Sequence, residues 1–262
     1  MDTTILVVAV IFTLSIVMVM SGRGGGNFYV AALVLLGTPM HAASTTSQFI
    51  LLVSALSGAL IFGKAKILSW SLAIFFGSLN AAMAFVGGFE AHLFTGPTLQ
   101  IVLSILLLIA GIAMLLPEKG RPRTADSRRG YWNLREREST YVINLKVAVP
   151  LTLASGFFSG MVGISGGSFL APLMVVGCGV PVRVAVGTCT VMLAATAFAG
   201  FLGNALHGGF VAALAVPAAL AAVAGGIIGG KVALKAKPKS LKTISGMLTI
   251  LAGAYMLFEG LL

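Results

Sequence analysis

The stretches GRGGGNF at residues 22–28 and GISGGSF at residues 163–169 repeat one pattern of glycine and phenylalanine, displaced by 141 residues (163 − 22). Beyond them the displacement becomes 142 residues, as between Pro39 and Pro181 (181 − 39). Ala43, Thr46, Gly58, Gly87, Gly88, Gly111 and Met114 recur in the same way as Ala185, Thr188, Gly200, Gly229, Gly230, Gly253 and Met256. Because glycine and proline restrict where a backbone can go, this recurrence predicts two copies of one chain path.

The composition is that of a membrane protein. Hydrophobic residues make up 58% of the 262 residues, charged residues make up 9%, and the mean hydropathy is +1.04. A soluble domain needs more polar surface than this. The apolar runs are long and continuous, which is typical of membrane-spanning helices and argues against alternating barrel strands. We therefore predict an all-α polytopic membrane protein.

Each copy contains five apolar segments, and the second of the five is short in both copies. A helix needs about 20 residues to cross the hydrocarbon core. The runs at 27–38 and 168–180 are shorter, and each follows a glycine cluster, so we predict short or re-entrant helices that begin at a glycine turn. The other segments are 3–21, 43–62, 67–88 and 98–117 in the first copy and 142–162, 185–206, 210–230 and 241–260 in the second.

The basic residues predict the orientation of the two copies. The formal net charge of +10 is concentrated at 119–137 and 231–242. Positive loops on the cytoplasmic side explain this pattern without a nucleic-acid partner. Lys64 and Lys66 place one loop inside, whereas the matching loop of the second copy has no Lys or Arg. The polarity is therefore opposite, and we predict two inverted repeats, at 1–117 and 141–262, with an odd number of crossings each and a basic, mobile cytoplasmic linker at 118–140.

The glycine clusters are the candidate substrate site. A helix N-terminus presents unpaired N–H groups and the positive end of the helix dipole, and glycine lets a ligand approach the backbone. Both properties favour an anion. Glycine in membrane helices more commonly permits close packing, and duplication before a short segment is what favours a substrate site here. Packing is the role that we predict for Gly87, Gly88, Gly225, Gly226, Gly229 and Gly230.

Candidate binding residues come from both copies. Arg23 lies inside the first cluster, where it either binds an anion or extends to the lipid headgroups. Thr46 and Thr188 match in position, and their hydroxyls can donate to an oxyanion or cap a helix. Interhelical hydrogen bonding is the role predicted for Gln48, Asn80 and Asn204. The full substrate-binding set is Arg23, Gly24, Gly25, Gly26, Asn27, Thr46, Gly166, Gly167, Ser168 and Thr188.

The duplicated glycine motif, with a proline turn and Ala-x-x-Thr after it in both halves, resembles the TauE/SafE sulfite exporter family of bacterial inner-membrane permeases. The resemblance extends from Gly22 to Leu262. It implies transport, commonly export, of sulfur-containing anions such as sulfite or sulfoacetate. The chain departs from the pattern at Ser165, which replaces the middle glycine of the second motif, and at Ala31, which stands where the second copy has Pro172.

We therefore expect a secondary transporter of small sulfur-containing oxyanions in the bacterial inner membrane, with no cofactor and no bound metal. The sequence has no Gly-x-x-x-x-Gly-Lys-Ser/Thr motif for ATP. The alternatives are a channel or permease for another small anion, such as a carboxylate, sulfate or thiosulfate, and an intramembrane enzyme. An enzyme is less expected because His41, His92 and His207 are scattered at segment ends. The coupling ion, proton or sodium, and assembly into a homo-oligomer are left open.

Overall fold

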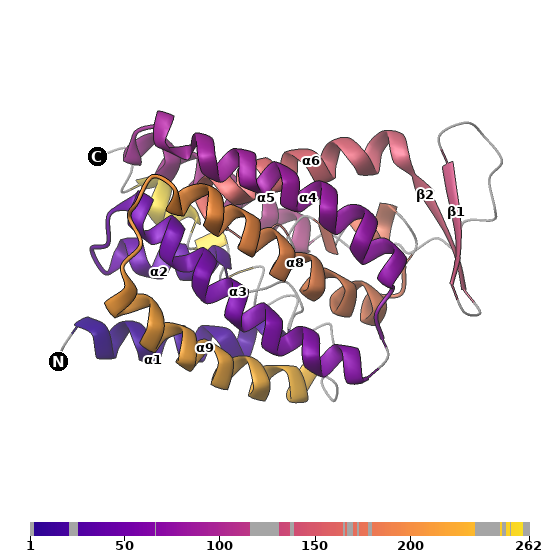
Figure 1. Cartoon of the computed structure of the whole chain (residues 1–262), viewed down its shortest axis with the longest axis horizontal. Helices are drawn as coiled ribbons and strands as arrows, with labels where there is room; N and C mark the ends of the chain where they lie inside the picture. The colour runs from indigo at the N-terminus through magenta and orange to yellow at the C-terminus, as the bar shows by residue number, and fades with distance from the viewer. Residues whose placement is uncertain are drawn as a thin grey trace.

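The computed structural model is an elongated bundle of helices (Figure 1). It describes residues 3–20, 26–65, 67–115, 131–136, 139–164, 166, 170–171, 173–177, 180–233, 247, 250–251 and 253–258. The first copy forms α1 (Thr3–Met20), α2 (Gly26–Leu35), α3 (Met40–Lys64), α4 (Trp70–Glu90), the 3-10 turn η1 (Ala91–Leu93) and α5 (Gly96–Leu115). The second forms α6 (Leu145–Val162), the π-helical turn η2 (Leu173–Gly177), α8 (Val182–Ala205) and α9 (Ala212–Ala233), with strands β1 (Tyr131–Glu136) and β2 (Ser139–Asn144) before it.

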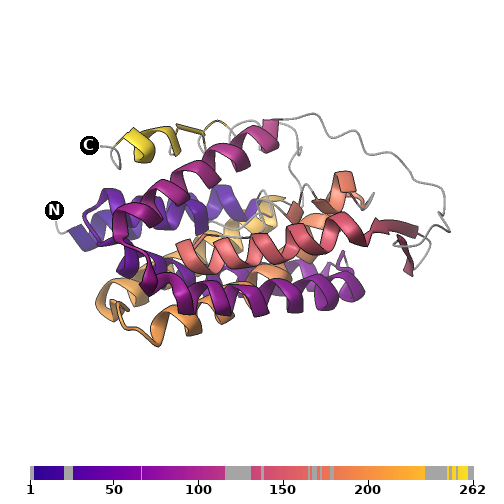
Figure 2. The ribbon, with the colours of Figure 1, turned by 90° about the horizontal axis from the view of Figure 1, so that it is seen from above.

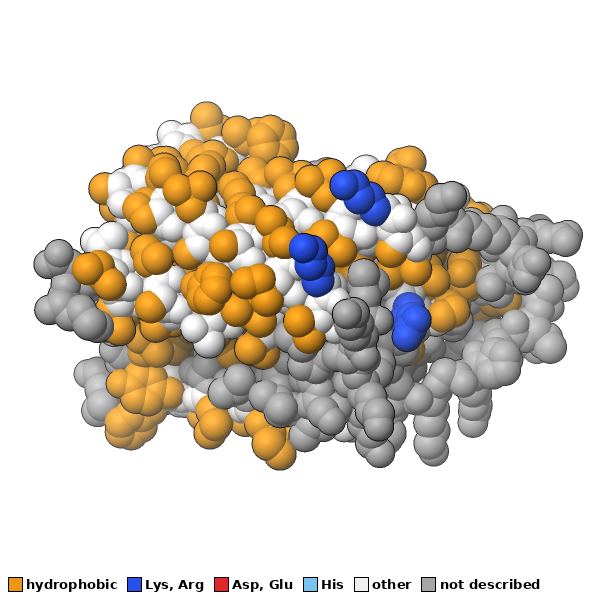
Figure 3. Space-filling view, turned by 90° about the horizontal axis from the view of Figure 1, so that it is seen from below, with side chains coloured by type: hydrophobic (Ala, Val, Ile, Leu, Met, Phe, Trp, Pro, Cys, Tyr) orange, Lys and Arg blue, Asp and Glu red, His pale blue; other side chains and the backbone are white. Residues whose placement is uncertain are grey.

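The helices confirm an all-α polytopic membrane protein. Among the described residues, five helices are long and apolar enough to cross a membrane, namely Met40–Lys64, Trp70–Leu93, Leu145–Val162, Arg183–Ala205 and Ala212–Val232. Large apolar side chains also lie exposed on the outside of the bundle, and the described part of the face in Figure 3 is mostly apolar. Leu60 and Leu220 are each 68% exposed. A surface of this kind is stable against lipid and not against water.

Matching helices of the two copies are nearly equal in length. α1 and α6 each have 18 residues, α3 and α8 have 25 and 24, and α4 and α9 have 21 and 22. α3 and α8 also begin alike. Their N-caps are Pro39, with φ −54° and ψ 143°, and Pro181, with φ −56° and ψ 138°. Since proline fixes φ and lacks an N–H donor, it starts both helices at the same point of the pattern.

The two copies exchange packing partners. α4 packs against α6, and in the equivalent position α9 packs against α1. A Cβ added at Gly87 would meet the carbonyl oxygen of Phe157, and one added at Gly229 would meet that of Ile16. These are equivalent contacts, because the glycines are 142 residues apart (229 − 87) and their partners 141 (157 − 16). The helices touch backbone to backbone, which confirms the packing role predicted for these glycines.

Matching helices run in opposite directions along the long axis. In Figure 1, α1, α3 and α9 run away from the side where the N-terminus lies, and α4, α6 and α8 run towards it, while Figure 2 shows α5 running away from that side. The inverted repeat stays a prediction, and this arrangement supports it. Lys64, Lys146, Arg183 and Lys231 all lie at helix ends on the far side, which we call the basic end.

The described part of the linker contains regular structure. The cytoplasmic linker at 118–140 stays a prediction, and its residues 131–136 and 139–140 belong to an antiparallel hairpin of β1 and β2 that the sequence did not lead us to expect. Residues 118–130 lie outside the described part. The strands pair Trp132 with Ile143 and Leu134 with Tyr141, and Tyr141 and Ile143 are buried in one cluster with Leu72 of α4 and Met192 of α8. Trp132 completes this packing, with its ring centroid 5.1 Å from that of Phe75.

The rest of the core lies where the two copies meet. A second cluster of buried side chains surrounds Tyr29 and Ile50 and joins α1, α2 and α3 to α8 and α9. A third surrounds Leu103 and Met161 and joins α2 and α5 to α6 and to Met256. Each cluster contains side chains from both copies, so the two copies form one folding unit and not two separate domains.

Candidate functional site

The second glycine cluster lies inside the bundle at Gly166. A Cβ added there would be 3.1 Å from Asn80 Oδ1 and 3.1 Å from Ser155 Oγ. Ser155 Oγ donates to the carbonyl oxygen of Gly166 at 3.3 Å, and that oxygen also accepts from the N–H of Leu170 at 3.0 Å. Gly166 is therefore glycine because polar side chains approach its backbone closely. Ser165, Gly167 and Ser168 lie outside the described residues.

Asn80 is the centre of this group and is fully buried. Its Nδ2 donates to the carbonyl oxygen of Thr152 on α6 at 2.9 Å, and its Oδ1 accepts from Thr196 Oγ1 on α8 at 2.7 Å. Helices α4, α6 and α8 thus meet at one amide. Interhelical hydrogen bonding was the role predicted for Asn80, and it is confirmed. We call Asn80, Ser155, Gly166 and Thr196 the Asn80 cluster.

The turn before Gly166 is fixed by α3 of the other copy. α6 ends at Gly163, which has φ +80°, a left-handed conformation that favours glycine. A Cβ there would meet Ser44, and Ser47 Oγ donates to the carbonyl oxygen of Gly163 at 2.8 Å. Ser159 Oγ donates to the carbonyl oxygen of Ile164 at 2.5 Å. The start of the second glycine motif is therefore held in place by α3 of the first copy.

The first glycine cluster is described only from Gly26, where α2 begins. Arg23, Gly24 and Gly25 lie outside the described residues, as does the side chain of Asn27. The described polar residue of α2 is the buried Tyr29, whose Oη is 2.7 Å from Ser15 Oγ on α1 and 3.4 Å from Ser54 Oγ on α3. Tyr29 matches Leu170 of the second copy (170 − 29 = 141). The two copies thus have different polar groups around the same frame.

The structure separates the two matched threonines. Thr188 Oγ1 accepts from the N–H of Ser69 at 3.0 Å, and Ser69 is the N-cap of α4, so Thr188 fixes the start of that helix. Thr46 Oγ1 is buried and has no hydrogen-bond partner among the described residues, and the same holds for Ser44 Oγ. A buried hydroxyl without a partner is costly unless water or a ligand reaches it. Thr46 is therefore a better candidate than Thr188 for contacting a bound anion.

A second interhelical network joins the copies nearer the N-terminal side. Gln48 Nε2 donates to the carbonyl oxygen of Gly160 at 2.9 Å, and Asn204 Nδ2 donates to the same oxygen at 2.8 Å. Asn204 Nδ2 is also 3.4 Å from Gln48 Oε1. The interhelical role predicted for these two amides is confirmed. Because α3, α6 and α8 meet here, the network ties the copies together.

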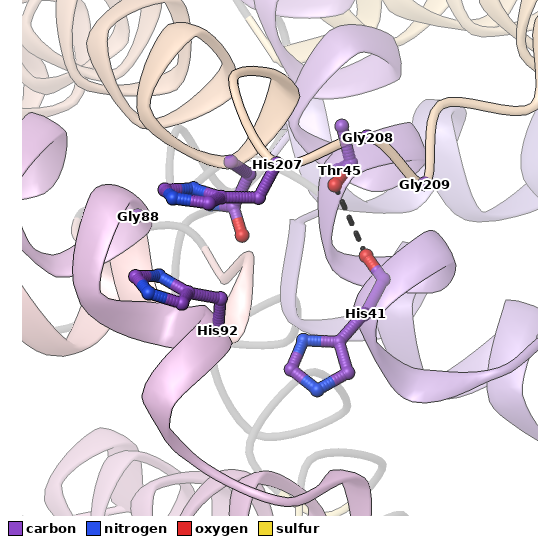
Figure 4. A pocket seen from close by; sticks show the side chains of 8 residues that line it. His41, Thr45, Gly88, His92, His207, Gly208 and Gly209 are labelled. Carbon is purple, nitrogen blue, oxygen red and sulfur yellow. Dashed lines mark hydrogen bonds between the residues drawn. The ribbon is translucent and has the colours of Figure 1, made fainter.

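Sequence reasoning missed a pocket that brings His41, His92 and His207 together (Figure 4). They lie at the start of α3, in η1 and just after α8, and line a cavity of about 340 Å³ together with Thr45 and Asn204. The three histidines are scattered along the sequence, at the ends of separate apolar segments, and the fold brings them to one pocket. The sequence contained a usable signal. In a bundle of antiparallel helices the start of one helix lies beside the end of the next, and His41 begins α3 whereas His92 and His207 follow the ends of α4 and α8. We call this end of the bundle the histidine end.

The family comparison covers both copies. The model of the sulfite exporter TauE/SafE family matches residues 7–256. The chain is 24% identical over 251 residues to the "probable membrane transporter protein YunE" of Bacillus subtilis (strain 168), with 92% of each chain covered. It is 25% identical over 259 residues to the "probable membrane transporter protein YdhB" of the same organism, covering 97% of this chain and 100% of that protein. The family match extends across both copies, and five helices of the described part are long and apolar enough to span a membrane; the chain belongs to the TauE/SafE sulfite exporter family of membrane transporters.

Proposed function

We propose that the chain is a secondary transporter that exports small sulfur-containing oxyanions, such as sulfite or sulfoacetate, across the bacterial inner membrane. The observation that carries the proposal is the match of the sulfite exporter family model to residues 7–256. The proposal makes the chain a carrier and not an enzyme. Either a proton or a sodium ion could serve as its coupling ion.

The Asn80 cluster supports a substrate site between the copies. It joins a glycine backbone to hydroxyl and amide groups at the depth where three helices cross. Hydroxyl, amide and backbone N–H donors bind an oxyanion without a permanent positive charge. Ser155 and Thr196 donate to Gly166 and Asn80 here, so an oxyanion at this site would take the place of those acceptors. We propose that Gly166, Gly167 and Ser168 contribute to this site, with Gly24, Gly25, Gly26, Asn27 and Arg23 as the other half-site and Thr46 as a hydroxyl donor. Thr188 also has a structural role, because its Oγ1 accepts from the N–H of Ser69 at the start of α4.

The test is uptake into proteoliposomes that contain the purified protein. Sulfite, sulfate, thiosulfate, sulfoacetate and a simple carboxylate are offered separately, and counterflow is measured with each. A carrier gives saturable uptake that is accelerated by substrate on the opposite side, whereas a channel gives flux without counterflow. Uptake of the carboxylate alone would overturn the assignment to sulfur oxyanions.

A matched pair of glycine variants tests the site. A Cβ in Gly166→Ala would be 3.1 Å from Asn80 Oδ1 and from Ser155 Oγ, tighter than normal contact, so we expect uptake to fall at least about tenfold with the protein still folded. Gly63→Ala is the control, because its Cβ would be 3.6 Å from Leu68 Cδ1, an ordinary contact. Equal uptake by the two variants would place the substrate elsewhere.

A further inference from the structure

The pocket at the histidine end has the size and lining of a small-ligand site. Its volume of about 340 Å³ is near the lower limit of ligand pockets, which hold about 300–1,000 Å³. Its walls come from α3, α4 and η1 of the first copy and from α8 of the second, and Figure 4 shows His92 and His207 on one side with His41 across from them. No group of three or more His, Cys, Asp or Glu side chains in the described part of the chain could hold a metal ion. The chemistry that the imidazoles offer here is proton uptake and hydrogen-bond donation.

His92 has one defined tautomer. Its Nδ1 is 2.7 Å from the carbonyl oxygen of Phe89, and because a carbonyl only accepts, Nδ1 must carry a proton and donate it. In the neutral ring Nε2 is then an acceptor, which repels an anion. Protonation turns Nε2 into a donor and gives the ring a positive charge. His92 can thus contribute a hydrogen bond to an anion only after it has taken up a proton.

His207 lies face to face with His92. The ring centroids are 3.8 Å apart and the planes differ by 16°, and Phe89 packs against both rings, with its centroid 4.8 Å from that of His207. Both rings are exposed to solvent, and two positively charged rings stacked in this way repel each other. An anion bound beside them would offset that repulsion. Proton uptake and anion binding are favourable together at this stack.

No described carboxyl group forms an ion pair with a histidine of this pocket, so a positive charge there has no partner of opposite sign among the described side chains. Among the described residues, Glu90 at the end of α4 is the carboxyl group of this side, and it forms no ion pair with a histidine. The loops before α5 and α9 contain no titratable residue at 94–96 or 208–211. The Lys and Arg side chains that the structure describes lie at the basic end. Histidine is thus the local source of positive charge.

We propose that this pocket is a second anion site, in which a small oxyanion binds together with a proton taken up by His41, His92 and His207. Thr45 and Asn204 complete its polar lining, and Asn204 also belongs to the amide network with Gln48 that joins the copies. An oxyanion here would therefore contact the helix ends of both halves. The site is separate from the Asn80 cluster and goes beyond the proposed function, because equilibrium binding to it requires no transport.

Calorimetric titration of the purified full-length protein with sulfate tests the proposal. Sulfate stays fully deprotonated, with two negative charges, between about pH 5.5 and about pH 8, so its own charge does not change across the range in which histidine titrates. We expect sulfate to bind at least about tenfold more tightly at the lower pH, since one linked proton changes affinity by up to about tenfold per pH unit. Titrations in two buffers of different ionisation enthalpy should show net proton uptake on binding. Absence of sulfate binding, or binding with no proton uptake, would overturn the proposal.

Variants assign the effect to the pocket. His41, His92 and His207 are all the histidines of the chain, so few other groups titrate in this range. His92→Gln and His207→Gln should each reduce the pH dependence to less than about threefold. His41→Gln, outside the stack, gives an independent variant if the stack is needed for folding. Arg183→Gln is the matched control, because Arg183 is the counterpart of His41 (183 − 41 = 142) at the basic end. Full pH dependence in all three histidine variants would also overturn the proposal.

Discussion

The two copies share a backbone frame and differ in the polar groups placed on it. Gly87 against Phe157 and Gly229 against Ile16 are equivalent crossings, and Pro39 and Pro181 cap equivalent helices with nearly equal dihedral angles. Yet Asn80 corresponds to Ala222 (222 − 80 = 142). Duplication thus preserves what holds the helices together, while the buried hydrogen-bonding groups have diverged. The two half-sites of the proposed carrier are chemically unequal.

The largest expected effect tests whether the crossing of α4 with α6 is equivalent to the crossing of α9 with α1. Gly87→Ala and Gly229→Ala each place a Cβ against a backbone carbonyl oxygen, which can relieve the contact only by separating two helices. We expect each to cost about 1–3 kcal/mol or more. Melting temperatures of the purified proteins measure this, with Gly63→Ala as the control that should melt like the wild type. A large loss in one variant and none in the other would show that the two crossings are not equivalent.

The next effect tests the divergence of the polar groups. Asn80→Ala removes the hydrogen bonds to Thr152 and Thr196, so we expect a loss of about 1–3 kcal/mol together with reduced anion uptake. Tyr29→Phe removes only a hydroxyl and leaves Ser15 bonded to the carbonyl oxygen of Ile11 at 2.7 Å, so its cost should be about 1 kcal/mol. The comparison is made by melting temperature and by uptake. Equal effects of the two variants would mean that the half-sites are equally important.

The smallest effect separates the matched threonines. Thr188→Val removes a hydrogen bond from the N–H of Ser69 at nearly constant volume, and we expect a loss of about 1 kcal/mol. Thr46→Val removes a buried hydroxyl that makes no hydrogen bond with the described residues. The free energy of unfolding of the unliganded variant should therefore lie within about 0.5 kcal/mol of the wild-type value. If Thr46 binds the anion, this variant should lose the anion-dependent rise in melting temperature. A wild-type rise would remove Thr46 from the substrate site.

The helix boundaries could be predicted because local residues determine them. Pro39 and Pro181 start α3 and α8, and Gly163 ends α6, through backbone properties that each residue carries alone. The partners could not be predicted, because Asn80 and Thr196 are 116 residues apart and no local pattern connects them. The stacking of His92 and His207 depends in the same way on which helix ends meet. The hairpin of β1 and β2 was not predicted, because the basic residues around it were interpreted as part of a mobile linker and the pairing of its two strands was not considered.

The exchange of partners between α1 and α9 also affects how the protein is made. α1 emerges from the ribosome before α9, and Gly229, against which its Ile16 packs, follows more than 200 residues later (229 − 16 = 213). At about 5–20 residues per second, synthesis of that interval takes on the order of 10 s or longer. Throughout that time α1 must stay inserted with lipid or a membrane chaperone on the face that α9 later covers. A nascent chain released before α9 would keep that face of α1 uncovered.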